Sequence, residues 1–173
     1  NELAGSGLYM TAGTADTVRV SFNQDRRYNL FNGAGIYMTG GVVTNSLIDG
    51  NSVVSDYGSM NGIGIYMTAG LVVDSVVKDN WRARNEFYGG GVAVAGAGTL
   101  LRCRIENNGS LGYGNGTSNT RGMGVYMNNA NGLIDRCVIV SNDIHGVWMN
   151  NGTLRNSLVQ GHETTGAGYT AGV

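Results

Sequence analysis

Gly33-Ala34-Gly35-Ile36-Tyr37-Met38 is the stretch that decides the fold, because copies of it recur along the chain. Close copies lie at 5–10, 62–67 and 122–127, weaker ones at 89–94 and 144–149, and a seventh begins at Gly166. The second glycines of successive copies are 28, 29, 27, 33, 22 and 22 residues apart. A repeat of this length predicts a solenoid, in which one unit cannot bury its apolar face alone.

A second motif runs in register with the first. A glycine after each Met position, such as Gly41, opens a run that closes on a polar residue ten positions later. The closing residues are Asn23, Asn51, Asn80, Asn108, Asn142 and His162. We expect the five asparagines to fill a turn, where they bond backbone groups and each other along the stack, with His162 as a structural replacement.

These two motifs together predict an all-β fold: a right-handed parallel β-helix of about six coils with 22–33 residues each. Each coil is expected to hold two or three strands of about four to six residues, stacked about 4.8 Å from the next coil. Equivalent apolar side chains should then form inward ladders. The predicted ladders are Leu8, Ile36, Ile65, Val92, Val125 and Val147; Met10, Met38, Met67, Val94, Met127 and Met149; and Val20, Ile48, Val77, Ile105, Ile139 and Val159.

Composition excludes several classes of partner. The chain has 30 Gly, no Pro and only 13% charged residues, while 42% of its residues are hydrophobic and fall in regular short runs. A formal net charge of −1 offers no electrostatic basis for binding nucleic acid. No apolar run approaches the ~20 residues that span a bilayer, so we expect no membrane insertion by this segment.

The outward face between the inward ladders carries aromatic residues. If Leu8 and Met10 point inward, the residue between them points out. The outward positions are Tyr9, Tyr37, Tyr66, Tyr126 and Trp148, with Ala93 as a gap. Rings about 5 Å apart can stack on sugar rings or cover a partner surface; alternatively, they only shield a strand surface.

Extra residues in the first four coils are predicted to emerge at one corner, in loops at about 24–32, 52–61, 81–88 and 109–121, although part of each could instead be a third short strand. Insertions confined to one face often mark the binding face of a solenoid. The corner collects the aromatic and basic residues that glycan or protein recognition uses, and solvated decoration is the alternative. The candidate binding residues are Arg26, Arg27, Tyr28, Tyr57, Trp81, Arg82, Arg84, Tyr88, Tyr113 and Arg121.

The repeats resemble those of bacterial surface proteins, namely polymorphic-membrane-protein-like and autotransporter-adhesin passengers. Gly33-Ala34-Gly35-Ile36 is similar to the Gly-Gly-Ala-Ile-like motif of that family, and Ile105-Glu106-Asn107-Asn108 to its Phe-x-x-Asn-like motif, with an aliphatic residue in place of Phe. The resemblance implies a bacterial protein that is extracellular or on the cell surface. The wider superfamily includes pectate lyase-like enzymes, so the fold does not choose between adhesion and catalysis.

Catalysis and metal binding have little support in the sequence. Neither an Asp-Asp pair nor Asp-x-Asp occurs, and there is no zinc spacing, phosphate-binding loop or calcium repeat. We therefore expect no catalytic residue, metal or cofactor, and interpret His145 as a surface or turn residue. Cys103 and Cys137 occupy one inward position in neighbouring coils, which predicts two buried thiols, with a disulfide as the alternative.

The leading hypothesis is a non-catalytic module for adhesion or for binding a glycan or a host or cell-surface protein. One alternative is a segment of a polysaccharide-active enzyme, and another is a structural spacer or filament. The chain begins just before one repeat and ends inside another, which we interpret as a single β-helix segment, 1–173, of a longer solenoid. Other chains at the solenoid ends are then further candidate partners.

Overall fold

The computed structural model describes residues 6–26, 32–54, 60–82, 87–110 and 121–162. Within these ranges the chain is all-β with no helix, and its strands pair in parallel. The strands form four sheets, which we name A to D.

The strands are assigned to the sheets as follows. Sheet A contains β1 (Leu8–Met10), β2 (Thr14–Asp16), β5 (Ile36–Met38), β6 (Val42–Thr44), β10 (Ile65–Val73), β14 (Val92–Leu101), β17 (Val125–Asp135) and β19 (Val147–Arg155). Sheet B contains β3 (Arg19–Ser21), β7 (Leu47–Asp49), β11 (Val76–Lys78), β15 (Arg104–Glu106), β18 (Val138–Val140) and β20 (Leu158–Gln160). Sheet C contains β4 (Gln24–Asp25), β8 (Ser52–Val53), β12 (Trp81–Arg82) and β16 (Gly109–Ser110), and sheet D contains β9 (Met60–Asn61) and β13 (Phe87–Tyr88).

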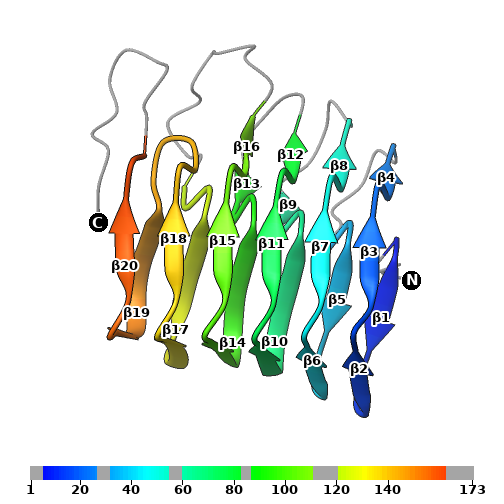
Figure 1. Ribbon diagram of the computed structural model, residues 1–173, viewed down its shortest axis with the longest axis horizontal. Coiled ribbons are helices and arrows are strands. Elements are labelled where there is room, and N and C mark those ends of the chain that lie inside the picture. The colour runs from blue at the N-terminus through cyan, green and yellow to red at the C-terminus, as the bar shows by residue number, and fades with distance from the viewer. Residues whose placement is uncertain (1–5, 27–31, 55–59, 83–86, 111–120, 163–173) are drawn as a thin grey trace.

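Neighbours within each sheet come from consecutive sequence repeats. Sheet A follows the order β1-β5-β10-β14-β17-β19 and sheet B the order β3-β7-β11-β15-β18-β20. Figure 1 shows these two sheets as facing layers along the long axis, with the short strands of sheet C at one margin. Such parallel stacking of repeats is consistent with a β-helix or another solenoid.

The register of the strands confirms the predicted inward ladders. Ile36 pairs with Leu8 and Ile65, and the same ladder continues through Val92 and Val125 to Val147. The Met ladder and the ladder of sheet B are also in register. Their side chains form the main core between sheets A and B, and most are fully buried. The repeat period was therefore sufficient to predict which side chains stack.

Strand lengths differ from the predicted four to six residues. In the first two repeats sheet A has strands of three residues on either side of Gly13 or Gly41, whereas β14 runs unbroken for 10 residues. The ranges predicted as corner loops also begin or end in paired strands, because β4, β8, β12 and β16 form sheet C, while β9 and β13 form sheet D. The alternative prediction, that part of each insertion forms a short strand, is therefore confirmed at the ends of these ranges.

Cys103 and Cys137 are free and buried, which confirms the prediction of two buried thiols. They continue a ladder of small polar residues, since the backbone N–H groups of Val18, Ser46 and Cys137 each donate to a serine Oγ of the next repeat. The Cys103 Sγ lies 3.4 Å from the carbonyl oxygens of Val72 and Leu101. The hydrogen bond with the neighbouring Cys137 thiol, followed by burial, raises the pKa of Cys103, so this thiol is held in its unreactive protonated form.

Candidate functional site

The predicted asparagine ladder lies at the corner between sheets B and C. The side chain of each asparagine donates from Nδ2 to the Oδ1 of the next asparagine at 2.9 Å, from Asn23 through to Asn142. The same Oδ1 also accepts the backbone N–H of the preceding asparagine at 3.0–3.1 Å. Asn51, Asn80, Asn108 and Asn142 are at most 1% exposed. The ladder is thus a structural element that fixes this corner.

The two sequence motifs touch at this corner. The second glycine of Gly-x-Gly packs against a ladder amide, because a Cβ built on Gly64 would lie 2.9 Å from the Asn80 Nδ2 and 2.5 Å from the Gly91 carbonyl oxygen. The first glycine has another role, since Gly33, Gly62, Gly89 and Gly122 have φ of 60–70°, which favours glycine. A fixed register between the motifs follows from this packing.

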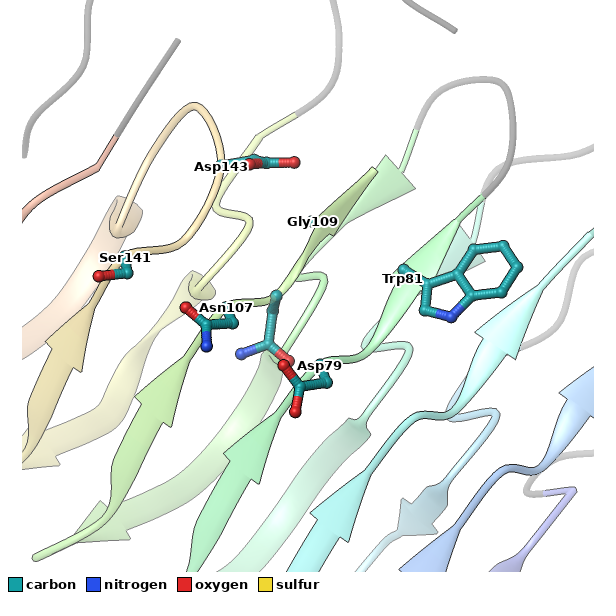
Figure 2. Close-up of a pocket in the computed structure, with 7 residues that line it drawn as sticks. Asp79, Trp81, Asn107, Gly109, Ser141 and Asp143 are labelled. Atoms are coloured by element: carbon teal, nitrogen blue, oxygen red, sulfur yellow. The ribbon is translucent and has the colours of Figure 1, made fainter. Parts of the chain in front are cut away.

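A cavity of about 390 Å³ opens beside the asparagine ladder (Figure 2). This volume falls within the range of small-molecule sites, about 300–1,000 Å³. The residues that line it come from repeats three, four and five: Asp79, Trp81, Asn107, Asn108, Gly109, Ser141 and Asp143. Buried Asn108 belongs to the ladder itself, so the ladder forms part of the cavity wall.

Local backbone conformation explains how the lining residues are presented. Asp79, Asn107 and Ser141 directly precede ladder asparagines and have φ of 54°, 52° and 53°. This left-handed turn suits Asp and Asn, whose short polar side chains can bond locally. On the other side of the ladder, Trp81 pairs in register with Gly109. Figure 2 shows the Trp81 indole and the Asp143 carboxylate on opposite sides of Gly109.

The absence of a side chain at Gly109 makes room for the Asp143 side chain. A Cβ at this position would collide with the Asp143 carboxylate, and the Asp143 backbone N–H donates to the Asn108 carbonyl oxygen at 3.0 Å. The carboxylate of Asp79 is paired with the Lys78 Nζ at 3.2 Å. The lining therefore combines one indole ring with carboxylate, amide and hydroxyl groups, and none of the lining residues that the structure describes is basic.

The predicted aromatic ladder forms on the outer face of sheet A. Ring centroids are 5.4 Å apart for Tyr9 and Tyr37, 5.1 Å for Tyr37 and Tyr66, and 5.0 Å for Tyr126 and Trp148. Arg121 lies over the Trp148 ring, with its guanidinium carbon 4.7 Å from the centroid.

The remaining corner candidates are placed differently from one another. Arg82 is fully buried, and burial lowers the pKa of its guanidinium to about 10, so it does not form a surface contact. Its neighbour Trp81 faces the cavity because side chains alternate along a strand. Arg26 is exposed and donates to the Gln24 Oε1 at 2.5 Å. Five candidates lie outside the described residues: Arg27, Tyr28, Tyr57, Arg84 and Tyr113.

Sequence reasoning did not select Asp79, Asn107, Ser141 or Asp143. A usable signal existed, because each of the first three directly precedes a ladder asparagine and Asp143 directly follows one. Residues that flank a buried ladder at a turn must point away from it, so they meet on the outside of the same corner.

His162 ends the asparagine ladder, and its Nδ1 lies 3.1 Å from the backbone nitrogen of Asn142. The same Nδ1 lies 3.2 Å from the Asn142 carbonyl oxygen. We assign the neutral form with Nδ1 unprotonated, because the Asn142 N–H needs an acceptor there. Burial lowers the pKa of His162 below 6.5, so the unfolded chain binds a proton more readily than the folded one. Stability present above pH 6.5 is therefore expected to fall as the pH drops below that value.

The variant His162→Asn should reduce this acid sensitivity, because an asparagine supplies the Oδ1 acceptor without titrating. Urea unfolding at pH 7.5, 6 and 5 measures the effect. His145 remains in both proteins, and burial lowers its pKa too, so the slope should decrease without vanishing. An unchanged slope would contradict the assigned role of His162.

The described ranges contain neither a candidate metal site nor a candidate membrane-spanning helix. Within them, no group of three or more His, Cys, Asp or Glu side chains is placed to hold a metal ion. The same ranges contain no helix with the length and apolar character that crossing a membrane requires.

Comparisons of the chain with protein-family models, with curated proteins and with solved structures found no match.

Proposed function

We propose that the chain is a segment of a right-handed parallel β-helix of about six coils, which acts as a non-catalytic glycan-binding module. The stacked parallel sheets, the inward ladders and the asparagine ladder support the architecture. A place on the surface of a bacterial cell, or outside it, is proposed from the resemblance of the repeat motifs to surface-protein passengers.

The cavity beside the asparagine ladder is the observation that carries the proposed function. The indole of Trp81 is half-buried and offers a flat apolar face for the C–H groups of a sugar ring. Asp79, Asn107 and Asp143 supply acceptors and donors for hydroxyl groups around that face. Among the described residues that line the cavity two are acidic and none is basic, which disfavours uronates and other anionic sugars. The expected ligand is therefore a neutral glycan.

Hydrolysis is the second candidate function, because two carboxylates, Asp79 and Asp143, line the same cavity. They belong to repeats three and five, so the stacking distance separates their backbones by about 10 Å along the axis. Glycosidase carboxyl groups are about 5–9.5 Å apart. Because the Asp143 side chain reaches over Gly109 of repeat four, its carboxylate lies nearer to repeat three than its backbone does, and an assay for new reducing ends decides between hydrolysis and binding.

Titration calorimetry with neutral and uronate oligosaccharides tests the proposal. Wild type should bind a neutral oligosaccharide, and Trp81→Ala should weaken that binding at least tenfold, about 1.4 kcal/mol. Phe22→Ala is the control, because Phe22 is also aromatic and 73% exposed but does not line the cavity. New reducing ends would support the enzyme, and no binding to any glycan would support the spacer.

A further inference from the structure

A second cavity lies where the aromatic ladder is interrupted. Ala93 takes the ladder position in repeat four, and its neighbours in register are Tyr66 and Tyr126. The position before the first glycine of the motif changes in the opposite sense. It is Asn61 in repeat three, and the residue paired with it in repeat four is Tyr88. Repeat four has thus moved its ring five residues earlier, from the ladder position to the position before Gly89.

The moved ring refills the gap only in part, because Ala93 is fully buried and a cavity nevertheless remains. Tyr88 lies 4.8 Å from Tyr126 but is tilted by 36°, whereas the ring pair of Tyr126 and Trp148 is tilted by only 3°. A cavity of about 210 Å³ remains. It is lined by three tyrosines, Tyr66, Tyr88 and Tyr126, together with Asn61, Asn128, Ala95 and fully buried Ala93.

Asn61 and Asn128 are the polar residues among those that line this cavity. The Asn61 Nδ2 donates to the Asn32 Oδ1 at 3.1 Å. The Asn61 Oδ1 is buried and accepts no hydrogen bond from any described residue. That atom has almost no accessible surface, so the polar lining group that a ligand can reach is the exposed side-chain amide of Asn128.

We propose that this cavity, which we call the Ala93 gap, binds one pyranose ring of a neutral sugar. Tyrosine rings face the C–H groups of the sugar, and the exposed amide of Asn128 bonds a sugar hydroxyl. The volume is below the ~300 Å³ of sites for larger ligands, which limits the occupant to one ring. None of the described residues that line the cavity is charged, which favours a neutral sugar. The Ala93 gap shares no residue with the cavity at Trp81, so the proposal does not rest on that site.

The double variant Tyr88→Asn/Ala93→Tyr tests the proposal, because it restores the pair found in repeats two and three and closes the gap. It is made in the Trp81→Ala background, so that the first cavity does not contribute. Ligand-observed NMR with the methyl glycosides of glucose, galactose and mannose measures binding. We expect millimolar binding by Trp81→Ala and at least tenfold weaker binding once the gap is closed.

Ala93→Leu provides a second way to fill the gap if the double variant folds poorly, and thermal unfolding checks both proteins. The inference is overturned if Trp81→Ala binds none of the three glycosides, or if closing the gap in a folded protein leaves binding unchanged. The function proposed for the Trp81 cavity is tested separately. It fails if wild type and Trp81→Ala bind the oligosaccharide with equal affinity.

Discussion

Asn80→Ala is expected to lower the free energy of unfolding by about 3–5 kcal/mol, which corresponds to a fall in Tm of roughly 10 °C for a chain of this size. The Asn80 Oδ1 accepts from both the backbone and the side-chain nitrogen of Asn51. The Asn80 Nδ2 donates to the Asn108 Oδ1 and to the carbonyl oxygens of Ile48 and Lys78. Alanine leaves several of these buried groups without a partner, which costs more than the bonds themselves.

Asn131→Ala is the matched control, because Asn131 is an exposed asparagine in β17. Its change should stay within about 0.5 kcal/mol. Thermal and urea unfolding of the two variants gives the comparison. Equal stability of Asn80→Ala and Asn131→Ala would mean that the ladder does not stabilise the corner.

Gly64→Ala is expected to cost about 3 kcal/mol or more, or to prevent folding. The added Cβ would lie 2.5 Å from the Gly91 carbonyl oxygen and 2.9 Å from the Asn80 Nδ2. The carbonyl belongs to the backbone of the next repeat and cannot move without separating two strands. The substitution therefore weakens both the sheet and the asparagine ladder.

Gly13→Ala separates crowding from backbone strain. Gly13 has φ of 83°, yet a Cβ there would meet no atom within 4 Å. Its cost should be about 1 kcal/mol, the price of a left-handed conformation alone. Thermal unfolding of both variants decides the matter: if Gly64→Ala is no more harmful than Gly13→Ala, close packing of the glycine against the ladder is not the reason for the motif.

The repeat made much of the fold predictable. Successive copies in one register place equivalent residues side by side, so Ile36 and Ile65 could be paired from spacing alone. Asn51 and Asn80 followed from the same logic. Strand lengths were less predictable, because a period of 22–33 residues does not say where hydrogen bonding pauses within a repeat.

The candidate sites were less predictable because they occur where the repeat is broken. Gly109 stands between the side chains of Trp81 and Asp143, and Ala93 stands between Tyr66 and Tyr126. Both small residues belong to repeat four, which has the longest spacing, 33 residues. The consensus indicates which side chains stack, whereas a departure from it indicates only that a side chain is missing. Whether a neighbour fills the space depends on three-dimensional packing, as the tilted ring of Tyr88 illustrates.

Arg82 illustrates a second limit of the sequence. Its neighbours Trp81 and Arg84 are aromatic and basic, so the segment has the composition of a binding loop. In the structure Arg82 lies in β12, where alternation turns it inward while Trp81 faces the cavity. Composition identified the right corner, and only the strand assignment separates the two side chains.

A crystal structure of the chain with a bound neutral oligosaccharide tests the central claim most directly. Our account predicts a pyranose ring stacked on the Trp81 indole, with hydroxyl groups within hydrogen-bond distance of Asp79, Asn107 or Asp143. A saturating ligand that leaves this cavity empty and binds elsewhere would contradict it.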